Sequence, residues 1–497
     1  MDPASRFSED DRISQVLEDN RLRIETIFKH CDDISLLPWS YGPDFQFQAF
    51  SVYLHTLVLK KKVNYMKESL QDLVPHEVGP ATMLEISDVI QFFSGKGVSA
   101  QSAQLVSHFE AAVQAVVMGN ILIFFDGWDH ALSYEALGLE TRQVTESTNE
   151  SSVQGPREAT IENLDKNIGM LRMRIKSPAF KVELLQIGTY SKTRIMYGYM
   201  ETLVLPETLG EFKKRIAAID VSMEIMEPTF IESMIEDSTY SPFPQYRYTE
   251  RTDTAAAALL EGKIIVMTQG SPSILICPGL FPEFFLTSED YYQRTVHSSL
   301  IRFLRMVAFF ISLLLPSIYI AFSTFHPELL PTVLLLTILD AREGIPFPAL
   351  VEAFIMEFFL EMLREAGVRL PKPIGSAVSI VGALVIGQAA IQAHIASPAM
   401  VIVVASTAIA SFAIPQYNIG ISLRVLRFPF MLLSATLGGF GLMIGGLLVY
   451  LHLTCLRTLG QPYLKTLSPI DPRKIVQLIF RPSMKAMLRY PHKSRGE

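Results

Sequence analysis

The stretch between Lys372 and Arg424 contains no Asp, Glu, Lys or Arg. It divides at a Ser-Pro pair into two apolar segments, residues 375–396 and 399–414. A core helix of a globular protein is a poor alternative for segments this long and uncharged. In hydrocarbon, every backbone N–H and C=O group must find its partner inside the protein, and a helix meets that requirement. The stretch therefore predicts helices embedded in a membrane.

Three more apolar segments lie near it and extend this pattern. Residues 303–322 are long enough to span a bilayer, whereas residues 329–339 are too short and indicate a half-helix or a re-entrant piece. Residues 428–453 form the last expected span, and their glycines allow close helix packing. The arginines and lysines that flank the spans are expected in the cytosol by the positive-inside rule. Because the number of full spans is odd, either 329–339 or 428–453 must depart from a simple crossing.

An acidic helix interrupts this apolar block. Residues 345–375 have helical spacing, and most of their charged side chains fall within one arc, while Phe and Met cover most of the rest. An ionisable group in hydrocarbon costs several kcal/mol unless it is paired or faces a polar interior. We therefore predict that this helix faces other helices or water, as a pore or gate would. The alternative is that the charges form i,i+3 and i,i+4 pairs at the wet end of a span. The pore and gating candidates are Glu352, which points elsewhere on the helix, and Glu357, Glu361, Arg364 and Glu365.

The first 300 residues have the composition of a soluble αβ region, and 497 residues are too many for one core. The formal charge of −7 gives no indication of nucleic-acid binding. The three cysteines show neither metal-ligand spacing nor a disulfide pattern. The first twenty residues are acidic and polar and lack the features of a signal peptide. We therefore expect this region to stay in the cytosol.

A repeated unit of helix and hairpin organises the soluble region. Helical spacing over 101–119 is followed by two strands in 119–136, joined by an Asp-Gly turn, and residues 254–278 repeat the helix and hairpin. Alignment of the two hairpins predicts two related αβ subdomains. The glycines that align are Gly119 with Gly262 and Gly127 with Gly270. The other expected elements are a strand within 45–63, a polar linker over 140–154, two strands in 179–201 and a helix over 207–219.

The predicted fold class is an α/β (α+β) cytosolic N-terminal region of two related small αβ subdomains, followed by a polytopic α-helical membrane domain. The expected divisions are an N-terminal arm (1–40), αβ subdomain 1 (41–139), a linker (140–158), αβ subdomain 2 (159–298), a helical transmembrane domain (299–456) and a basic cytosolic C-terminal tail (457–497). No Ser-His-Asp set, phosphate-cradling glycine loop or metal-ligand spacing occurs in the sequence. We therefore expect neither an enzyme nor a bound cofactor or metal.

A rigid turn in the soluble region is a candidate coupling loop. Its two prolines fix φ and force the residues before them to be extended. The turn either reports domain movement to the membrane or only places the following charged residues on a surface. Nearby arginines could pair with Glu250 or Asp253 across subunits; these are Arg157, Arg172 and Arg174. The coupling-loop candidates are Arg157, Glu158, Pro242, Phe243, Pro244, Gln245, Glu250, Arg251 and Asp253. Just before the first span, Asp290, Tyr291, Tyr292 and Arg294 are expected to anchor at the headgroups.

Six motifs resemble those of a known family. They are QGPREATIENLDKNIGMLRMRI (154–175), STYSPFPQYRYTERTD (238–253), EDYYQR (289–294), EGIPFPALVEAF (343–354), LREAGVRLPKPIG (363–375) and QYNIGISLRVLRF (416–428). With them, the chain from about Met118 to Tyr463 resembles the A subunit of the GerA-type germinant receptors of endospore-forming bacteria. One departure is TERTD at 249–253, where the family usually has TERPD.

The resemblance implies a multi-pass protein of the inner membrane of the bacterial endospore, with its N-terminal domain in the cytosol. It implies a transporter-like B subunit and a C lipoprotein as partners, and a small nutrient that binds the complex. It also implies self-association, as a pentamer, into a ligand-gated channel that releases cations to trigger spore germination. Three alternatives stay open: a family paralogue that amplifies germination without being a nutrient-receptor subunit, a secondary transporter, and a passive membrane scaffold.

Overall fold

The computed structural model describes residues 11–41, 47–59, 61–63, 104–138, 154–220, 222, 224, 227–370, 372–465, 476 and 478–482. The chain forms two units. Unit 1 comprises Met1–Glu236 and Tyr248–Pro278, and unit 2 comprises Asp237–Arg247 and Gly279–Glu497. Nearly all of the linker expected over 140–154, and most of the expected basic tail, lie outside the described residues.

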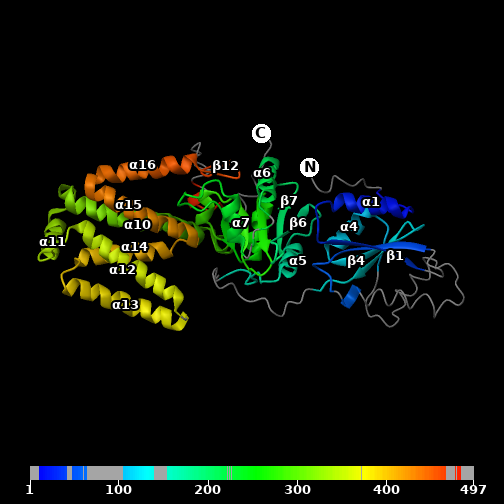
Figure 1. The fold of residues 1–497 in the computed structure, drawn as a ribbon, viewed down its shortest axis with the longest axis horizontal. Helices are drawn as coiled ribbons and strands as arrows, with labels where there is room; N and C mark the ends of the chain where they lie inside the picture. Colours follow the sequence, from blue (N-terminus) through cyan, green and yellow to red (C-terminus); the bar gives the residue numbers. More distant parts are fainter. Residues whose placement is uncertain are drawn as a thin grey trace. The chain divides into compact units, whose positions relative to one another are not determined.

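The first half of unit 1 is a five-stranded antiparallel sheet with the order β1-β2-β4-β5-β3. Helices α1 and α4 cover one face, where Ile24 and Phe109 pack with Phe50 and Phe124 of the strands (Figure 1). Successive strand residues point to opposite faces, so a second apolar set covers the other side. The elements are α1 (Leu17–Ile27), β1 (Ile34–Tyr41), β2 (Phe47–Leu54), β3 (Gln104–Val106), α4 (Phe109–Val117), β4 (Asn120–Phe125) and β5 (Ala131–Glu135).

The second half of unit 1 is also a five-stranded sheet, with the order β6-β7-β9-β10-β8. Helices α5 and α8 contribute Leu164 and Leu259 to a core that includes Val182 and Ile265 of the strands. Phe212 of α6 packs on the ring of Tyr197 in β7. The elements are α5 (Leu164–Arg174), β6 (Phe180–Ile187), β7 (Thr193–Met200), α6 (Pro206–Ala217), α7 (Pro228–Ile235), β8 (Arg247–Thr249), α8 (Thr252–Leu260), β9 (Ile264–Thr268) and β10 (Ile274–Cys277).

The two sheets repeat one topology. In each, a helix precedes a hairpin, a further strand takes the far edge, and a second helix leads into a second hairpin. The second copy differs by the insertion of α6 and α7 before its edge strand. The aligned glycines all have positive φ, the region that glycine adopts without strain: Gly119 (91°) with Gly262 (80°), and Gly127 (80°) with Gly270 (91°). The strand order thus agrees with the duplication predicted from the hairpins.

Two boundaries in unit 1 differ from expectation. Residues 34–41, expected partly in the N-terminal arm, form strand β1 and pair along their whole length with β2. The helix expected over 101–119 begins only at Phe109, because residues 104–106 pair with β5 as strand β3. Both strands lie at sheet edges. Their conformation depends on a partner strand distant in sequence, which local spacing does not show.

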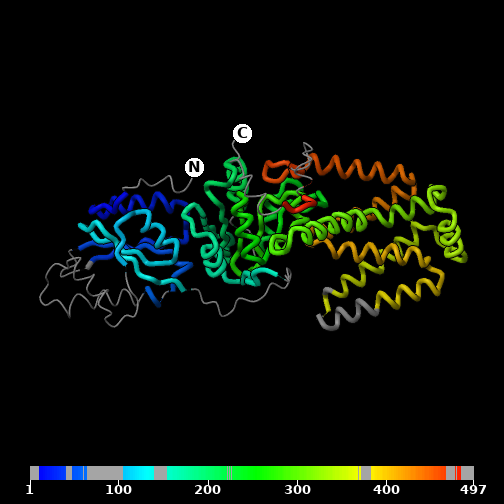
Figure 2. Tube along the Cα trace, turned by 180° about the vertical axis from the view of Figure 1, so that it is seen from behind, coloured from blue at the N-terminus to red at the C-terminus, as the bar shows by residue number. Residues whose placement is uncertain are grey.

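Unit 2 is a helical bundle. Helix α10, with 30 residues, packs along α14 and α15, and α12 packs against α13 and α14 (Figures 1 and 2). Among the described residues, α10 and α15 are long and apolar enough to cross a membrane, whereas α14, α16 and the Gly382–Gln392 part of α13 are apolar but shorter. The elements are α9 (Glu289–Tyr292), α10 (Thr295–Thr324), α11 (Thr332–Arg342), α12 (Ala349–Arg369), α13 (Lys372–Gln392), α14 (Pro398–Phe412), α15 (Tyr417–Leu437), α16 (Gly439–Cys455), β11 (Arg457–Thr458) and β12 (Gln461–Pro462), with 3-10 turns at Phe281–Phe285 and Pro327–Leu329.

The segment expected as one last span, 428–453, is two helices, so that prediction was wrong. Helix α15 ends at Leu437 and α16 begins at Gly439. Gly438 between them has a φ of +61°, and a Cβ at this position would lie 2.7 Å from the Cβ of Phe325. Both the backbone angle and the packing therefore require glycine at the break. Composition showed that this segment is rich in glycine, but not which glycine ends the helix.

Candidate functional site

Helix α12 carries the carboxylates predicted for a pore or gate. Glu357 forms an ion pair with Arg427 of α15, and each side chain is 1% exposed. Arg427 Nε also donates to the backbone carbonyl of Ser312 in α10 at 2.9 Å. Pro316, four residues after Ser312, has no N–H to bond that carbonyl within the helix. A proline in α10 thus leaves an acceptor for the buried arginine.

Glu361 lies one turn further along α12 and joins two arginines. Arg364 of the same helix and Arg424 of α15 each donate to its carboxylate at 3.0 Å. Arg364 also donates to the hydroxyl of Ser411 in α14 at 3.2 Å. Charged and polar contacts therefore connect α12 to both α14 and α15 at this level.

The remaining two carboxylates of the predicted set lie in different surroundings. Glu352 is fully buried; one of its oxygens accepts the backbone N–H of Ser397 at 2.9 Å, and the other lies 3.2 Å from Arg342 Nη2 of α11. Glu365 pairs with Arg369 on the surface, where its side chain is 66% exposed. Four of the five predicted residues thus contact other helices. In the part of the chain that the structure describes, no group of three or more His, Cys, Asp or Glu could hold a metal ion.

The arginines that pair with α12 were not among the predicted site residues. Arg424 and Arg427 were expected to flank a span that begins at residue 428, but both lie inside α15. Their spacing of three residues was a usable signal, because it places them on one helix face, as does the spacing of four between Glu357 and Glu361. Which helix faces α12 depends on bundle packing, which the spacing does not report.

The predicted coupling loop belongs to unit 2. The hydroxyl of Ser422 in α15 donates to the carbonyl of Pro242, and the hydroxyl of Tyr463 donates to the carbonyl of Pro244 at 2.7 Å. Between the prolines, Phe243 is 3% exposed and packs in the core of unit 2. Each proline thus presents a backbone acceptor to the rest of unit 2, while the intervening phenylalanine packs in its core.

The loop is also braced internally. Gln245 is 2% exposed; its amide oxygen accepts the N–H of Asp237, and its amide nitrogen donates to the carbonyl of Ser238, both at 2.8 Å. The carbonyl of Gln245 in turn accepts the N–H of Gly279 at 2.9 Å. The Asp237 carboxylate accepts the N–H of Leu459 at 2.8 Å. A buried side chain that bonds both ends of a turn holds it in one conformation.

The other coupling candidates lie in unit 1. Arg251 binds Asp253 through two hydrogen bonds of 3.0 and 2.7 Å, and the backbone carbonyl of Glu250 accepts the N–H of Thr160 at 2.8 Å. Arg157 and Glu158 are exposed. Two of the arginines expected to reach Glu250 or Asp253 across subunits form ion pairs within this chain: Arg174 pairs with Glu158 at 2.8 Å, and Arg172 pairs with the fully buried Asp33 at 2.8 Å.

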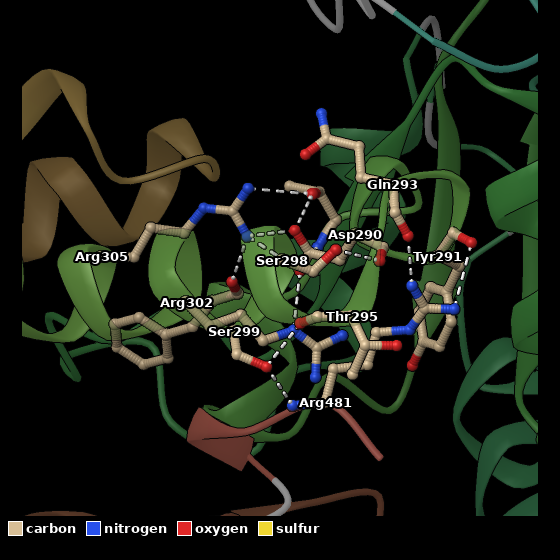
Figure 3. Close-up of polar contacts among 11 residues, drawn as sticks. Asp290, Tyr291, Gln293, Thr295, Ser298, Ser299, Arg302, Arg305 and Arg481 are labelled. Atoms are coloured by element: carbon tan, nitrogen blue, oxygen red, sulfur yellow. Dashed lines mark hydrogen bonds and ion pairs between the residues drawn. The ribbon is translucent and has the colours of Figure 1, made fainter. Parts of the chain in front are cut away.

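A second charged cluster lies at the start of α10 (Figure 3). Asp290 of α9 accepts hydrogen bonds from Arg302 Nε at 3.0 Å and from Arg305 Nη1 at 2.9 Å. The hydroxyl of Ser298 donates to the backbone carbonyl of Asp290 at 2.7 Å. Asp290 is 3% exposed, whereas Tyr291 beside it is 43% exposed. In the expected anchoring segment, the tyrosine is therefore at the surface and the aspartate is held inside by arginines.

Comparisons with known proteins cover nearly the whole chain. Residues 22–493 match the family model described as Bacillus/Clostridium GerA spore germination protein. The uncharacterized membrane protein YfkQ of Bacillus subtilis (strain 168) is 40% identical over 487 residues, which cover 97% of this chain and 92% of that protein. Spore germination protein KA of the same organism is 47% identical over 366 residues, which cover 74% of this chain and 67% of that protein. The crystal structure of the N-terminal domain of the A subunit of the Bacillus megaterium spore germinant receptor GerK3 aligns at 25% identity with a TM-score of 0.42, and covers 55% of this chain and 98% of that one.

Proposed function

The chain belongs to the GerA spore germination family, which confirms the family predicted from its motifs, and on this premise we propose that it is the A subunit of a nutrient germinant receptor. In this proposal the protein crosses the inner membrane of the endospore several times and keeps unit 1 in the cytosol. It acts with a transporter-like B subunit and a C lipoprotein. Five copies assemble into a channel that a small nutrient, bound by the complex, opens to cations.

The gating part of this proposal rests on one observation. Helix α15 forms hydrogen bonds with both the coupling loop and the acidic helix α12. Its Ser422 donates to the carbonyl of Pro242 in the loop, and its Arg424, two residues later, donates to Glu361 of α12. The loop is inserted between α7 and β8 in the chain, so a displacement of either element pulls on it covalently. Force on the loop would then act on α15 and on its ion pairs with α12.

The ion pairs define how such a gate could have two states. Removing one partner of a buried pair costs about 3–5 kcal/mol, so the favoured transition exchanges partners instead of leaving a charge alone. The side chain of Glu361 is 29% exposed, whereas that of Glu357 is 1% exposed. A cation that reaches Glu361 would compete with Arg424 for the carboxylate, and acidic groups lower the cost of dehydrating a cation. We assign Glu361 to the cation path and Glu357 to the helix contact behind it.

The unit 1 candidates have a supporting part in this proposal. The bidentate pair of Arg251 and Asp253 holds the segment that follows the loop, and Glu158 with Arg174 holds the segment that starts α5. Rigid flanking segments transmit displacement better than mobile ones. We therefore propose that these residues maintain the coupling geometry without touching a ligand.

A paralogue that amplifies germination is the second candidate function. The alignment with the uncharacterized protein YfkQ covers 97% of this chain, whereas the alignment with spore germination protein KA covers 74%. The relative that aligns over more of this chain is thus an uncharacterized one, so similarity alone does not assign the receptor role. Affinity capture of this chain from sporulating cells separates the two functions, because only a receptor subunit should retain a B-type transporter-like partner.

The direct test is ion flux in liposomes that contain this chain with and without its candidate B and C partners. A panel of amino acids and sugars is added to each preparation. Cation flux that depends on both the partners and one nutrient would support the receptor channel. Well-folded, fully partnered protein that conducts no cations with any nutrient would contradict the channel and leave the amplifier or scaffold functions.

A further inference from the structure

Two arginines bind one carboxylate at the start of α10, and a third arginine lies against the same tyrosine ring as one of them (Figure 3). Arg302 and Arg305 both donate to Asp290. Arg481, from the C-terminal segment, donates to two backbone carbonyls at 2.7 and 3.2 Å, and its own N–H donates to a serine hydroxyl of α10 at 3.1 Å. Carbonyl groups satisfy hydrogen bonds but carry no charge. Three guanidinium groups less one carboxylate leave two positive charges uncompensated among these side chains.

Two guanidinium nitrogens of this cluster also lack acceptors. Among the described residues, Arg302 Nη2 and Arg481 Nε are buried and have no hydrogen-bond partner. The two arginines are only 4% and 5% exposed, so bulk water does not replace the missing acceptors. Both guanidinium groups lie against the ring of Tyr291, at 5.5 and 5.4 Å from its centroid. The face of an aromatic ring attracts a cation but does not accept the N–H groups that point elsewhere. The two buried N–H groups therefore lack an acceptor, and the positive excess of the cluster favours an acceptor that is anionic.

The surface beside the cluster matches a membrane interface. Tyr291 and Tyr292 are 43% and 42% exposed, and Val296 and Leu300, one turn apart on α10, are 84% and 55% exposed. Exposed tyrosines and aliphatic side chains next to basic groups are typical of the depth at which lipid headgroups lie. The Tyr291 ring is both exposed and in contact with two of the arginines. The arginine cluster therefore lies directly beneath this surface, separated from it by the Tyr291 ring.

We propose that Arg302, Arg305 and Arg481 bind the phosphate group of an anionic phospholipid headgroup. The phosphate oxygens accept the unpartnered N–H groups, and the negative charge offsets part of the positive excess. The planar guanidinium fork suits phosphate geometry. Asp290 competes with the phosphate for Arg302 and Arg305. The bound headgroup connects the C-terminal segment, through Arg481, to the start of α10. This inference rests on the membrane location in the proposed function but not on channel activity.

The test uses the full chain, purified in a neutral detergent and examined by native mass spectrometry and thermal unfolding. The probes are dioctanoyl phosphatidylglycerol, dioctanoyl phosphatidylcholine and inorganic phosphate. We expect phosphatidylglycerol to bind about ten-fold more tightly than phosphatidylcholine, because only the former has a net charge for the cluster to compensate. Arg481→Gln should weaken phosphatidylglycerol binding about ten-fold. Asp290→Asn should tighten it, since the competing carboxylate is lost.

The control is Arg369→Gln, which removes an exposed arginine of α12 whose partner is Glu365. It should leave the lipid preference unchanged. Arg481→Gln keeps Asp290 with its two arginines, and Asp290→Asn changes the affinity in the opposite direction, which general destabilisation cannot do.

Equal binding of the two lipids, or equal affinities in all variants, would overturn the proposal. A thermal shift produced by inorganic phosphate alone, without lipid preference, would also overturn it. No outcome depends on ion flux, so a protein that binds lipid but conducts nothing would contradict only the channel.

Discussion

Arg427 of α15 and Glu357 of α12 form an ion pair with 1% of each side chain exposed. One turn along, Arg424 pairs with Glu361, whose side chain is 29% exposed. The same two helices are therefore joined at two levels, one sealed within the bundle and one that solvent reaches. This difference in burial determines what each substitution should change. Substitutions in the buried pair should change the stability of the bundle, and substitutions in the exposed pair should change ion movement.

Loss of Arg427 should destabilise the bundle strongly. In Arg427→Met the carboxylate of Glu357 stays buried without its partner, which costs about 3–5 kcal/mol. The double substitution Arg427→Met with Glu357→Leu removes both charges and should recover most of the loss. Thermal unfolding of the detergent-purified proteins measures both changes. If the double variant is as unstable as the single one, the unpaired Glu357 carboxylate is not the cause. The lost hydrogen bond to Ser312 or poor packing would then explain the destabilisation.

Glu361→Ala should reduce cation release at a normal protein level. The substitution removes the accessible carboxylate that we assign to the cation path. Glu365→Ala is the matched control, because it removes a surface carboxylate of the same helix that pairs with Arg369. Flux in liposomes or in germinating spores is the measurement. Unchanged flux in Glu361→Ala would remove this residue from the path.

Ser422→Ala should weaken the response to the nutrient without unfolding the protein. The lost hydroxyl is the donor from α15 to Pro242, and one such hydrogen bond contributes about 1 kcal/mol. Ser323→Ala serves as the control, because that hydroxyl donates to a carbonyl of its own helix. The readout is the nutrient concentration for half-maximal release, beside the melting temperature. Equal shifts in both variants would argue against coupling through this loop.

Two glycines of α16 should respond oppositely to alanine. A Cβ on Gly441 would lie 2.0 Å from the backbone oxygen of Leu433, whereas a Cβ on Gly446 would meet nothing within 4 Å. Gly441→Ala should therefore cost about 1–3 kcal/mol through displaced helices. Gly446→Ala should be neutral or stabilising by up to about 1 kcal/mol, because alanine favours the helix. Thermal unfolding of the pair is the measurement, and equal effects would exclude close packing at Gly441.

Unit 1 should lose stability as the pH rises from about 4.5 to about 7. Burial, assisted by the nearby Glu236, raises the pKa of Glu232 to about 7, although the hydrogen bond from Tyr248 acts to lower it. Between these pH values the folded state keeps a proton on Glu232 that the unfolded state has released. The stabilisation is therefore complete below the pKa of Glu232 in the unfolded state, and it is lost as the pH rises through the pKa in the folded state. Glu232→Gln should flatten the pH dependence of unfolding, and the exposed Glu207→Gln should not. Identical slopes in both variants would contradict the shift.

Local features of the sequence determined many of the elements of this protein, but not the edge strands β1 and β3 or the break after α15. The charge-free stretch predicted α13 and α14, the two hairpins with aligned glycines predicted β4 with β5 and β9 with β10, and the acidic helix was predicted over the residues that form α12. These predictions hold because helix spacing, apolar runs and glycine turns depend on neighbours within a few residues. The six motifs identified the family for the same reason, since each is a continuous run.

Only the tertiary structure decided which elements face each other. Glu357 and Arg427 are 70 residues apart, and Pro242 and Ser422 are 180 apart. No periodicity extends over such separations, so the partner of a charged residue depends on how whole helices pack. The break at Gly438 has the same origin, because the contact with Phe325 makes that glycine, among several nearby, the end of α15. Short-range spacing determined what each segment is, and long-range packing determined what each charge does.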